Sequence, residues 1–188
     1  MPFVLGLTGL ASAGKGEVSN YLVKKYGFTK MVFSDVLREE AKRRNLLENK
    51  SYEEQKYVLS KLGEKLREES GRWDILAIKL IEKIKAEKIE RVVVDGFRSV
   101  EEVNLFRKNF DKFNLVFIDA DEKIRFERRK AEDPRADIEN FMRRDKENIE
   151  VMGLGKVIEI ADLKISNNEQ GFKKLYERVD DLLNKINH

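Results

Sequence analysis

The segment 9–16, which reads Gly-Leu-Ala-Ser-Ala-Gly-Lys-Gly, constrains the fold of this chain more than any other feature. Residues 3–8 before it are apolar and bounded by turns, which predicts a buried strand. Residues 17–25 after it carry apolar side chains on one face, which predicts a helix. A glycine-rich loop in this setting is typical of a phosphate-binding loop (P-loop). The alternative is a glycine-rich turn that contains a lysine by chance.

The residue types in this loop fit a nucleoside triphosphate. Gly9 and Gly14 permit backbone angles that direct successive N–H groups inward, and the following helix adds its positive dipole end. Lys15 is long enough to reach the β- and γ-phosphates. We therefore expect Gly9, Ala13, Gly14 and Lys15 to bind ATP.

The loop departs from its usual pattern at Gly16, where most such loops carry Ser or Thr. That hydroxyl normally ligates Mg²⁺, so we expect Mg²⁺ to be held by other groups, mainly through water. Glu17 follows in the first helical turn, where a carboxylate suits the helix dipole but does not replace the hydroxyl. Gly16 and Glu17 complete the expected nucleotide-binding set.

Composition limits the class of protein. A length of 188 residues fits one domain over 1–188 with an inserted lid. The chain has no Cys, no long apolar run and no leader-like start, so we expect a cytoplasmic protein without membrane contact. The net charge of +3 comes from interspersed charges, which argues against a nucleic-acid partner. The single His is His188, so a carboxylate is the expected general base.

Strand and helix patterns alternate along the chain. Further strands are predicted at residues 28–33, 91–94, 115–118 and 163–165. Further helices are predicted at residues 36–46, 52–70, 75–84, 100–110, 123–130, 138–148 and 172–186. This order predicts an α/β fold in which helices cover both faces of a parallel sheet, with ligands at the carboxyl ends of the strands.

A second strong signal is Asp95-Gly96-Phe97-Arg98 after the strand at 91–94. A carboxylate at the end of that strand can lie beside the P-loop and orient the water around Mg²⁺. Gly96 lets the chain turn so that Arg98 faces the cleft. In the alternative interpretation, Asp95 is the N-cap of the next helix and Arg98 is a surface charge.

Arginines are concentrated between residues 125 and 144. They are Arg125, Arg128, Arg129, Arg135, Arg143 and Arg144. On two helices joined by a polar turn, guanidinium groups suit a flap that closes over the triphosphate and stabilises charge on the transferring phosphoryl group. The alternative is a solvated helical hairpin, and spacing does not show which arginines contact phosphate.

Two further candidates precede the second half of the chain. Asp35 can orient the attacking oxygen of an acceptor, and Arg38 can hold the phosphate of that acceptor. Equally, Ser34 or Asp35 can be the N-cap of its helix. Trp73 can stack on a base, although core packing is the favoured interpretation for a lone Trp before an apolar run.

Five segments together resemble the dephospho-coenzyme A kinase-like and adenylate kinase-related nucleotide kinases. They are residues 9–17, 34–40, 94–99, 124–128 and 161–167. The resemblance implies a P-loop kinase fold with a helical lid at about residues 125–148. It also implies roles for single residues: ATP on Lys15 and its loop, Mg²⁺ near Asp95, the acceptor near Arg38 and Arg98, the lid from Arg128, and adenine near Asn167.

From these features we expect an ATP-dependent, Mg²⁺-dependent phosphotransferase. The expected catalytic residues are Lys15, Asp35, Arg128 and Arg144, and Asp35 with Arg38 and Arg98 are expected to bind the acceptor. A nucleoside or deoxynucleoside monophosphate is the preferred acceptor, because two arginines suit a phosphate. Dephospho-coenzyme A is the alternative substrate. An ATP-binding regulatory or interaction module with little turnover is the alternative from another class, and the oligomeric state stays open.

Overall fold

Five parallel strands form the centre of the molecule, in the order β2-β3-β1-β4-β5. The computed structural model describes residues 2–151 and 153–186, so His188 lies outside the described residues. The strands are β1 (Phe3–Thr8), β2 (Thr29–Val32), β3 (Arg91–Asp95), β4 (Phe113–Asp119) and β5 (Leu163–Ser166). The predicted α/β fold with a parallel sheet is confirmed, and β1 at its centre leads directly into the P-loop.

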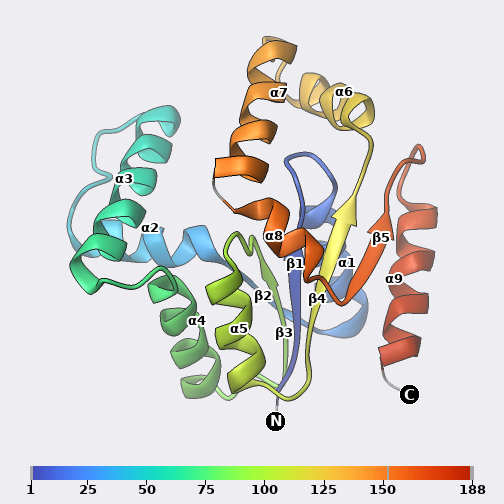
Figure 1. The fold of residues 1–188 in the computed structure, drawn as a ribbon, viewed down its shortest axis with the longest axis horizontal. Helices are drawn as coiled ribbons and strands as arrows, with labels where there is room; N and C mark the ends of the chain where they lie inside the picture. Colours follow the sequence, from blue (N-terminus) through green and yellow to red (C-terminus); the bar gives the residue numbers. More distant parts are fainter. Residues whose placement is uncertain (1, 152, 187–188) are drawn as a thin grey trace.

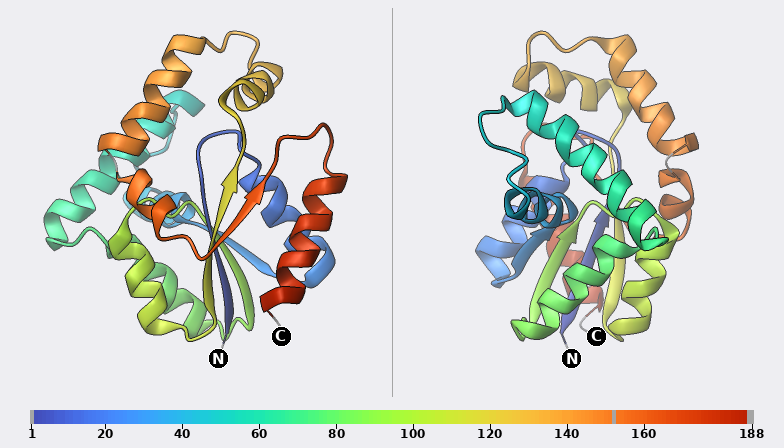
Figure 2. Two further views of the ribbon diagram at one scale, coloured as in Figure 1. Left: turned by 45° about the vertical axis from the view of Figure 1, so that its right-hand side comes forward. Right: turned by 90° about the vertical axis from the view of Figure 1, so that its left-hand side faces the viewer.

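Helices cover both faces of this sheet (Figures 1 and 2). One face is covered by α1 (Lys15–Tyr26) and α9 (Lys173–Ile186), whose buried side chains form one apolar cluster with β1 and β4. The other cluster is larger. Its helices are α2 (Phe33–Arg43), α3 (Tyr52–Ser70), α4 (Ile75–Ala86), α5 (Val100–Asn109) and α8 (Leu154–Glu159). No helix in the described part of the chain is long and apolar enough to cross a membrane.

The lid lies beyond the carboxyl ends of the strands (Figure 1). It consists of α6 (Glu122–Glu132) and α7 (Ile138–Lys146), and α7 continues into a π-helical turn, η1 (Glu147–Val151). Neither η1 nor the short helix α8 was predicted from the sequence. A wider turn leaves no distinct pattern over five residues, and Gly153, with φ of 83°, separates α8 from it.

Two alternatives based on helix caps are wrong. The N-cap of α2 is Val32, which places Ser34 and Asp35 inside the first turn. The N-cap of α5 is Ser99, whose hydroxyl accepts the backbone N–H of Glu102 at 3.2 Å, so Asp95 is not a cap. Asp95 is instead the last residue of β3, at the carboxyl end of the parallel strands, where the P-loop also begins after β1.

Candidate functional site

The P-loop needs glycine at both of its ends. Gly9 has φ of 140°, and a Cβ atom there would lie 2.4 Å from the carbonyl oxygen of Ile118. Gly14 has φ of 109° and immediately precedes α1. Side chains are strained at such angles, and at Gly9 the neighbouring backbone of β4 leaves no room. These two residues therefore bring the loop close to the sheet and turn it into the N-terminus of α1.

Lys15 lies in the centre of the site. Its Nζ donates hydrogen bonds to the carbonyl oxygens of Gly9, at 2.8 Å, and Leu10, at 2.9 Å. Burial lowers the pKa of Lys15, and the charge of Asp95 opposes that shift. The ammonium group is thus held inside the loop, within reach of any phosphate that the loop binds.

Two cavities meet at Lys15. The first, which we call the nucleotide cavity, has a volume of about 870 Å³ and is lined by the P-loop, α6 and the segment 167–172. Its lining includes Gly14, Lys15, Gly16, Glu17, Asp95, Arg128 and Asn167. The second, which we call the small cavity, has a volume of about 100 Å³ and is lined by Lys15, Arg98 and Asn148 among others. Lys15 is the lining residue that the two cavities share.

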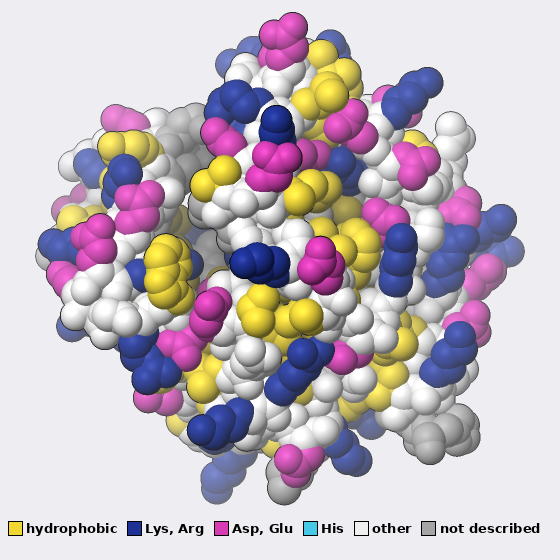
Figure 3. All heavy atoms as spheres, viewed as in Figure 1, with side chains coloured by type: hydrophobic (Ala, Val, Ile, Leu, Met, Phe, Trp, Pro, Cys, Tyr) yellow, Lys and Arg dark blue, Asp and Glu magenta, His cyan; other side chains and the backbone are white. Residues whose placement is uncertain are grey.

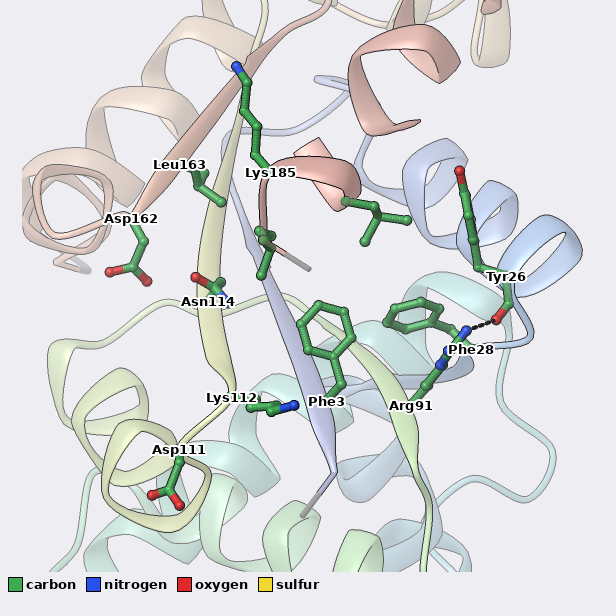
Figure 4. A pocket seen from close by; sticks show the side chains of 12 residues that line it. Phe3, Tyr26, Phe28, Arg91, Asp111, Lys112, Asn114, Asp162, Leu163 and Lys185 are labelled. Atoms are coloured by element: carbon green, nitrogen blue, oxygen red, sulfur yellow. Dashed lines mark hydrogen bonds between the residues drawn. The ribbon is translucent and has the colours of Figure 1, made fainter. Parts of the chain in front are cut away.

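A further cavity of about 610 Å³ lies at the opposite edge of the sheet, where its lining includes Phe3, Phe28 and Arg91 (Figure 4). Phe3 and Arg91 begin their strands, whereas ligands of parallel sheets bind at the carboxyl ends. Its lining includes no residue of the P-loop. We therefore place the functional site at the nucleotide cavity.

Besides Lys15, Asp95 is suited to bind a nucleotide through its metal ion. Its Oδ1 is buried and has no hydrogen-bond partner among the described residues. Burial raises the pKa of Asp95, and Lys15 opposes that effect. A lone buried oxygen of this kind fits a water molecule bound to Mg²⁺. Within residues 2–151 and 153–186, no group of three or more His, Cys, Asp or Glu side chains could hold a metal ion by itself.

Gly16 and Glu17 do not compensate for the missing hydroxyl. Gly16 is exposed, and no atom lies within 4 Å of the place where its Cβ would be. The carboxylate of Glu17 accepts a hydrogen bond from the hydroxyl of Tyr176, which raises the pKa of Tyr176 to about 12. The ring of Tyr176 stacks on that of Tyr21 at 4.0 Å. Glu17 therefore connects the P-loop to α9.

Asn167 braces the P-loop. Its side chain is buried, and its Nδ2 donates to the carbonyl oxygen of Ala13 at 2.8 Å. Its own carbonyl oxygen accepts a hydrogen bond from Arg128 at 2.8 Å. Asn167 thus lines the nucleotide cavity, as the resemblance implies, but its amide is occupied by the loop. Phe172, the first residue of the helix predicted at 172–186, precedes α9, is 48% exposed and lies on the same lining.

The arginines of the lid have different environments. Arg125 is buried, forms an ion pair with Asp145 at 2.6 Å and donates to the carbonyl oxygens of Ala120 and Ala11. It joins α6, α7 and the P-loop and is not available to a ligand. Arg128 lines the nucleotide cavity and donates to the carbonyl oxygen of Ser12 at 3.4 Å.

The remaining lid arginines lie further out. Arg129 and Arg135 pair with Asp133, and Arg143 pairs with Glu147. For these three, the interpretation as a solvated hairpin describes the structure. Arg144 is exposed, and the described residues offer its side chain no ion-pair partner. It lies outside both cavities as they stand in this conformation.

Of the three residues expected to bind the acceptor, one lines a cavity at the site. Arg98 lines the small cavity, whereas Asp35 and Arg38 on α2 line neither of the two cavities. The Nε of Arg38 is buried without a hydrogen-bond partner in the described chain.

Trp73 is 68% exposed, so the expectation that it packs in the core is wrong.

Sequence reasoning did not identify three residues near the site. Asn148 lies in η1 and lines the small cavity, and Phe172 lines the nucleotide cavity. Arg67 on α3 has a buried Nε without a partner among the described residues. No motif in the sequence marks these residues.

The fold and the P-loop define a kinase-like, nucleotide-binding domain of the P-loop class. A family model described as an AAA domain matches residues 8–152. The chain belongs to the UPF0200 family: it is 31% identical to the UPF0200 protein of Methanoregula boonei, with 97% of both chains covered. It is also 35% identical to the UPF0200 protein of Pyrococcus abyssi, with 97% of this chain and 96% of that one covered.

Solved structures with a similar fold include kinases. Shikimate kinase from Bacteroides thetaiotaomicron matches with a TM-score of 0.61 at 14% identity, covering 98% of this chain and 97% of that one. A gluconokinase from Sinorhizobium meliloti matches with a TM-score of 0.57 at 14% identity, covering 98% and 93%. The predicted P-loop kinase fold is therefore confirmed, and at these identities the likeness concerns the fold alone.

Proposed function

We propose that this protein transfers the γ-phosphoryl group of ATP to a nucleoside or deoxynucleoside monophosphate. One observation carries the proposal: Lys15 lines both the nucleotide cavity and the small cavity, and Arg98 also lines the small cavity. A γ-phosphate held by the loop would therefore face an acceptor phosphate held by Arg98. The single domain over residues 1–188 and the cytoplasmic location remain predictions.

The residues act by positioning and by stabilising charge. Lys15 exchanges its contacts with the carbonyl oxygens of Gly9 and Leu10 for phosphate oxygens, and Arg128 adds positive charge from the lid. Mg²⁺, when bound beside Asp95, neutralises charge on the phosphates. An acceptor oxygen forms a bond to the γ-phosphorus while the bond from that phosphorus to the β–γ bridging oxygen breaks, which releases ADP.

The absence of a general base from the small cavity favours a phosphate acceptor. The lining includes no Asp, Glu or His, and Asp35 is exposed on α2. A phosphate monoester is already ionised at neutral pH and needs no base, whereas a hydroxyl acceptor does. This difference supports a nucleoside monophosphate over dephospho-coenzyme A.

A second candidate is an ATP-binding regulatory module with little turnover. The observation that favours it is the open space at Gly16, together with the hydrogen bond that commits Glu17 to Tyr176. Without a hydroxyl at this point, the loop binds Mg²⁺-ATP with one ligand fewer than most P-loops. Binding without acceptor-dependent hydrolysis is the behaviour that distinguishes this candidate.

Release of ADP tests the proposal. The purified protein is incubated with ATP and Mg²⁺ and, in separate reactions, with the nucleoside monophosphates, the deoxynucleoside monophosphates and dephospho-coenzyme A. We expect ADP release that depends on a monophosphate and disappears in Lys15→Met. Release with dephospho-coenzyme A alone would overturn the choice of acceptor. Saturable ATP binding with no release in any reaction would establish the regulatory module instead.

A further inference from the structure

The turn between α3 and α4 displays the only Trp of the chain. Trp73 is 68% exposed although the residues on both sides of it are fixed. Arg72 donates two hydrogen bonds to Asp74, each at 2.8 Å, and the hydroxyl of Ser70 accepts the N–H of Arg72 at 3.2 Å. A turn that only connects two helices does not need a large ring in water, where its apolar surface is unfavourable.

Arg67 lies against this ring. Its guanidinium carbon is 5.9 Å from the ring centroid, and its Nε is buried without a hydrogen-bond partner in the described chain. Gly63, one turn earlier on α3, lies beside the guanidinium group, since a Cβ there would be in ordinary contact with Nη1 at 3.6 Å. The cation therefore supports one side of the indole ring, and most of the ring surface stays open.

The charge of Arg67 also acts on Glu102, the carboxylate that binds the backbone beside Arg98. Glu102 is 2% exposed, and its carboxylate accepts the backbone N–H groups of Arg98, at 3.0 Å, and Ser99, at 3.2 Å. Burial raises the pKa of Glu102, and the charges of Arg67 and Arg98 oppose that shift. Arg67 and Arg98 thus lie around the same carboxylate. The face drawn in Figure 3 is hollowed between the side of α3 and the lid helices.

We propose that Trp73, supported by Arg67, stacks on the base of the acceptor nucleotide. Aromatic rings and guanidinium planes bind bases by their faces, which all bases share. The site therefore selects acceptors with a planar ring and discriminates little among the bases. This inference rests on the proposed function, since it assigns the base-binding half of the acceptor site whose phosphate-binding half contains Arg98.

Tryptophan fluorescence tests the contact directly, because Trp73 is the only reporter in the chain. The protein is first saturated with a non-hydrolysable ATP analogue and Mg²⁺, and then titrated with AMP, CMP or ribose 5-phosphate. We expect saturable quenching by AMP and CMP and none by ribose 5-phosphate, which keeps the phosphate but lacks the base. Emission that no nucleoside monophosphate changes would overturn the proposal.

Kinetics separate a stacking role from a structural one. Trp73→Ala should raise the acceptor KM about tenfold and leave kcat and the KM for ATP unchanged. Trp73→Phe should restore most of the loss, and Tyr57→Ala, which removes another exposed aromatic ring from α3, should match the wild type.

Two other outcomes would contradict the inference in different ways. A change in oligomeric state in Trp73→Ala, measured by sedimentation, would make this ring a protein interface. Rapid ADP release with an acceptor that lacks a planar ring, unaltered in Trp73→Ala, would remove the base-binding role while leaving phosphotransfer intact. Failure to bind ATP at all would instead contradict the proposed function.

Discussion

Gly16 has open space around the position that a side chain would occupy. Gly16→Ser should lower the Mg²⁺ concentration needed for half-maximal ADP release, and should raise activity about fivefold, because it adds a hydroxyl ligand. Gly16→Ala is the matched control. It should raise the free energy of unfolding by about 0.5–1 kcal/mol, since alanine favours the helix, without altering the Mg²⁺ dependence. If ADP release depends on Mg²⁺ concentration in the same way in Gly16→Ser and Gly16→Ala, the metal is bound elsewhere.

Arg98 is the arginine that lines the small cavity, whereas Arg38 lies on α2 with an unsatisfied Nε among the described residues. Arg98→Ala should cost about 2 kcal/mol in kcat/KM for the acceptor, with ATP affinity nearly intact, because a charge-assisted contact to phosphate is lost. Arg38→Ala should also lower kcat/KM for the acceptor. If both contact one phosphate, the double variant loses less than the sum, which initial-rate measurements determine. Wild-type acceptor KM in both variants would remove them from the site.

At the scale of single elements, the lid contains one arginine that lines the nucleotide cavity and others that do not. Arg128→Ala should lower kcat about 100-fold and weaken ATP binding much less, because its contact strengthens as charge develops. Arg135→Ala, whose side chain is 93% exposed, should leave both unchanged. Single-turnover rates and ATP titrations separate the two effects. A fall in ATP affinity as large as the fall in kcat would assign Arg128 to ground-state binding.

The ion pairs in the last turn of α2 should make the free energy of unfolding depend on pH. Arg43 and Arg44 donate hydrogen bonds to Glu40, and Arg43 makes the larger contribution, which lowers the pKa of Glu40 to about 2. A lowered pKa stabilises the fold above the ordinary value near 4.5, and that contribution disappears as the pH falls towards 2.

Glu40→Gln should therefore lower the free energy of unfolding at neutral pH, and the difference from wild type should shrink below pH 4.5. Denaturant unfolding at a series of pH values measures this. Glu39→Gln is the control, because Glu39 is exposed and its one ion pair among the described residues is with Lys83 on the surface. A difference that does not change with pH would mean that packing, and not charge, is lost.

Elements with strong local signals could be predicted from the sequence. The capping box of Ser51 and Glu54 marks the start of α3, which spans the predicted residues, and the apolar run of β1 has its predicted bounds. The helix before α8 was extended too far because the π-helical turn keeps helical composition while changing the hydrogen-bond spacing. Local pattern is sufficient for regular elements and insufficient for irregular turns.

At the scale of the whole molecule, contacts between distant parts of the chain were beyond prediction. The exposure of Trp73 depends on how the turn after α3 packs, and the burial of Arg125 depends on Asp145 of another helix. Motif spacing predicted the P-loop and a site role for Arg98, but not which polar groups are already paired within the fold. The candidate site therefore needed the structure to separate residues that brace it from residues open to a ligand.

Asn167 makes such a bracing contact. Asn167→Ala should lower the free energy of unfolding by about 1–3 kcal/mol, because the carbonyl oxygen of Ala13 loses its buried partner. It should also weaken ATP binding, since the loop is less fixed. Asn109→Ala is the control, because the amide of Asn109 donates to the carbonyl oxygen of Leu105 and Asn109 lines neither cavity. Unchanged ATP affinity in Asn167→Ala would show that the loop holds its shape without the brace.

The hydrogen bond between Asn167 and Ala13 has a consequence for the order in which the protein matures. The two residues are separated by 154 positions, so the ribosome makes the loop early and its brace late. Until β5 pairs with β4, a nascent chain carries the loop without its partner at this carbonyl. We therefore expect affinity for nucleotide to arise in one late step of synthesis, which keeps incomplete chains from sequestering ATP.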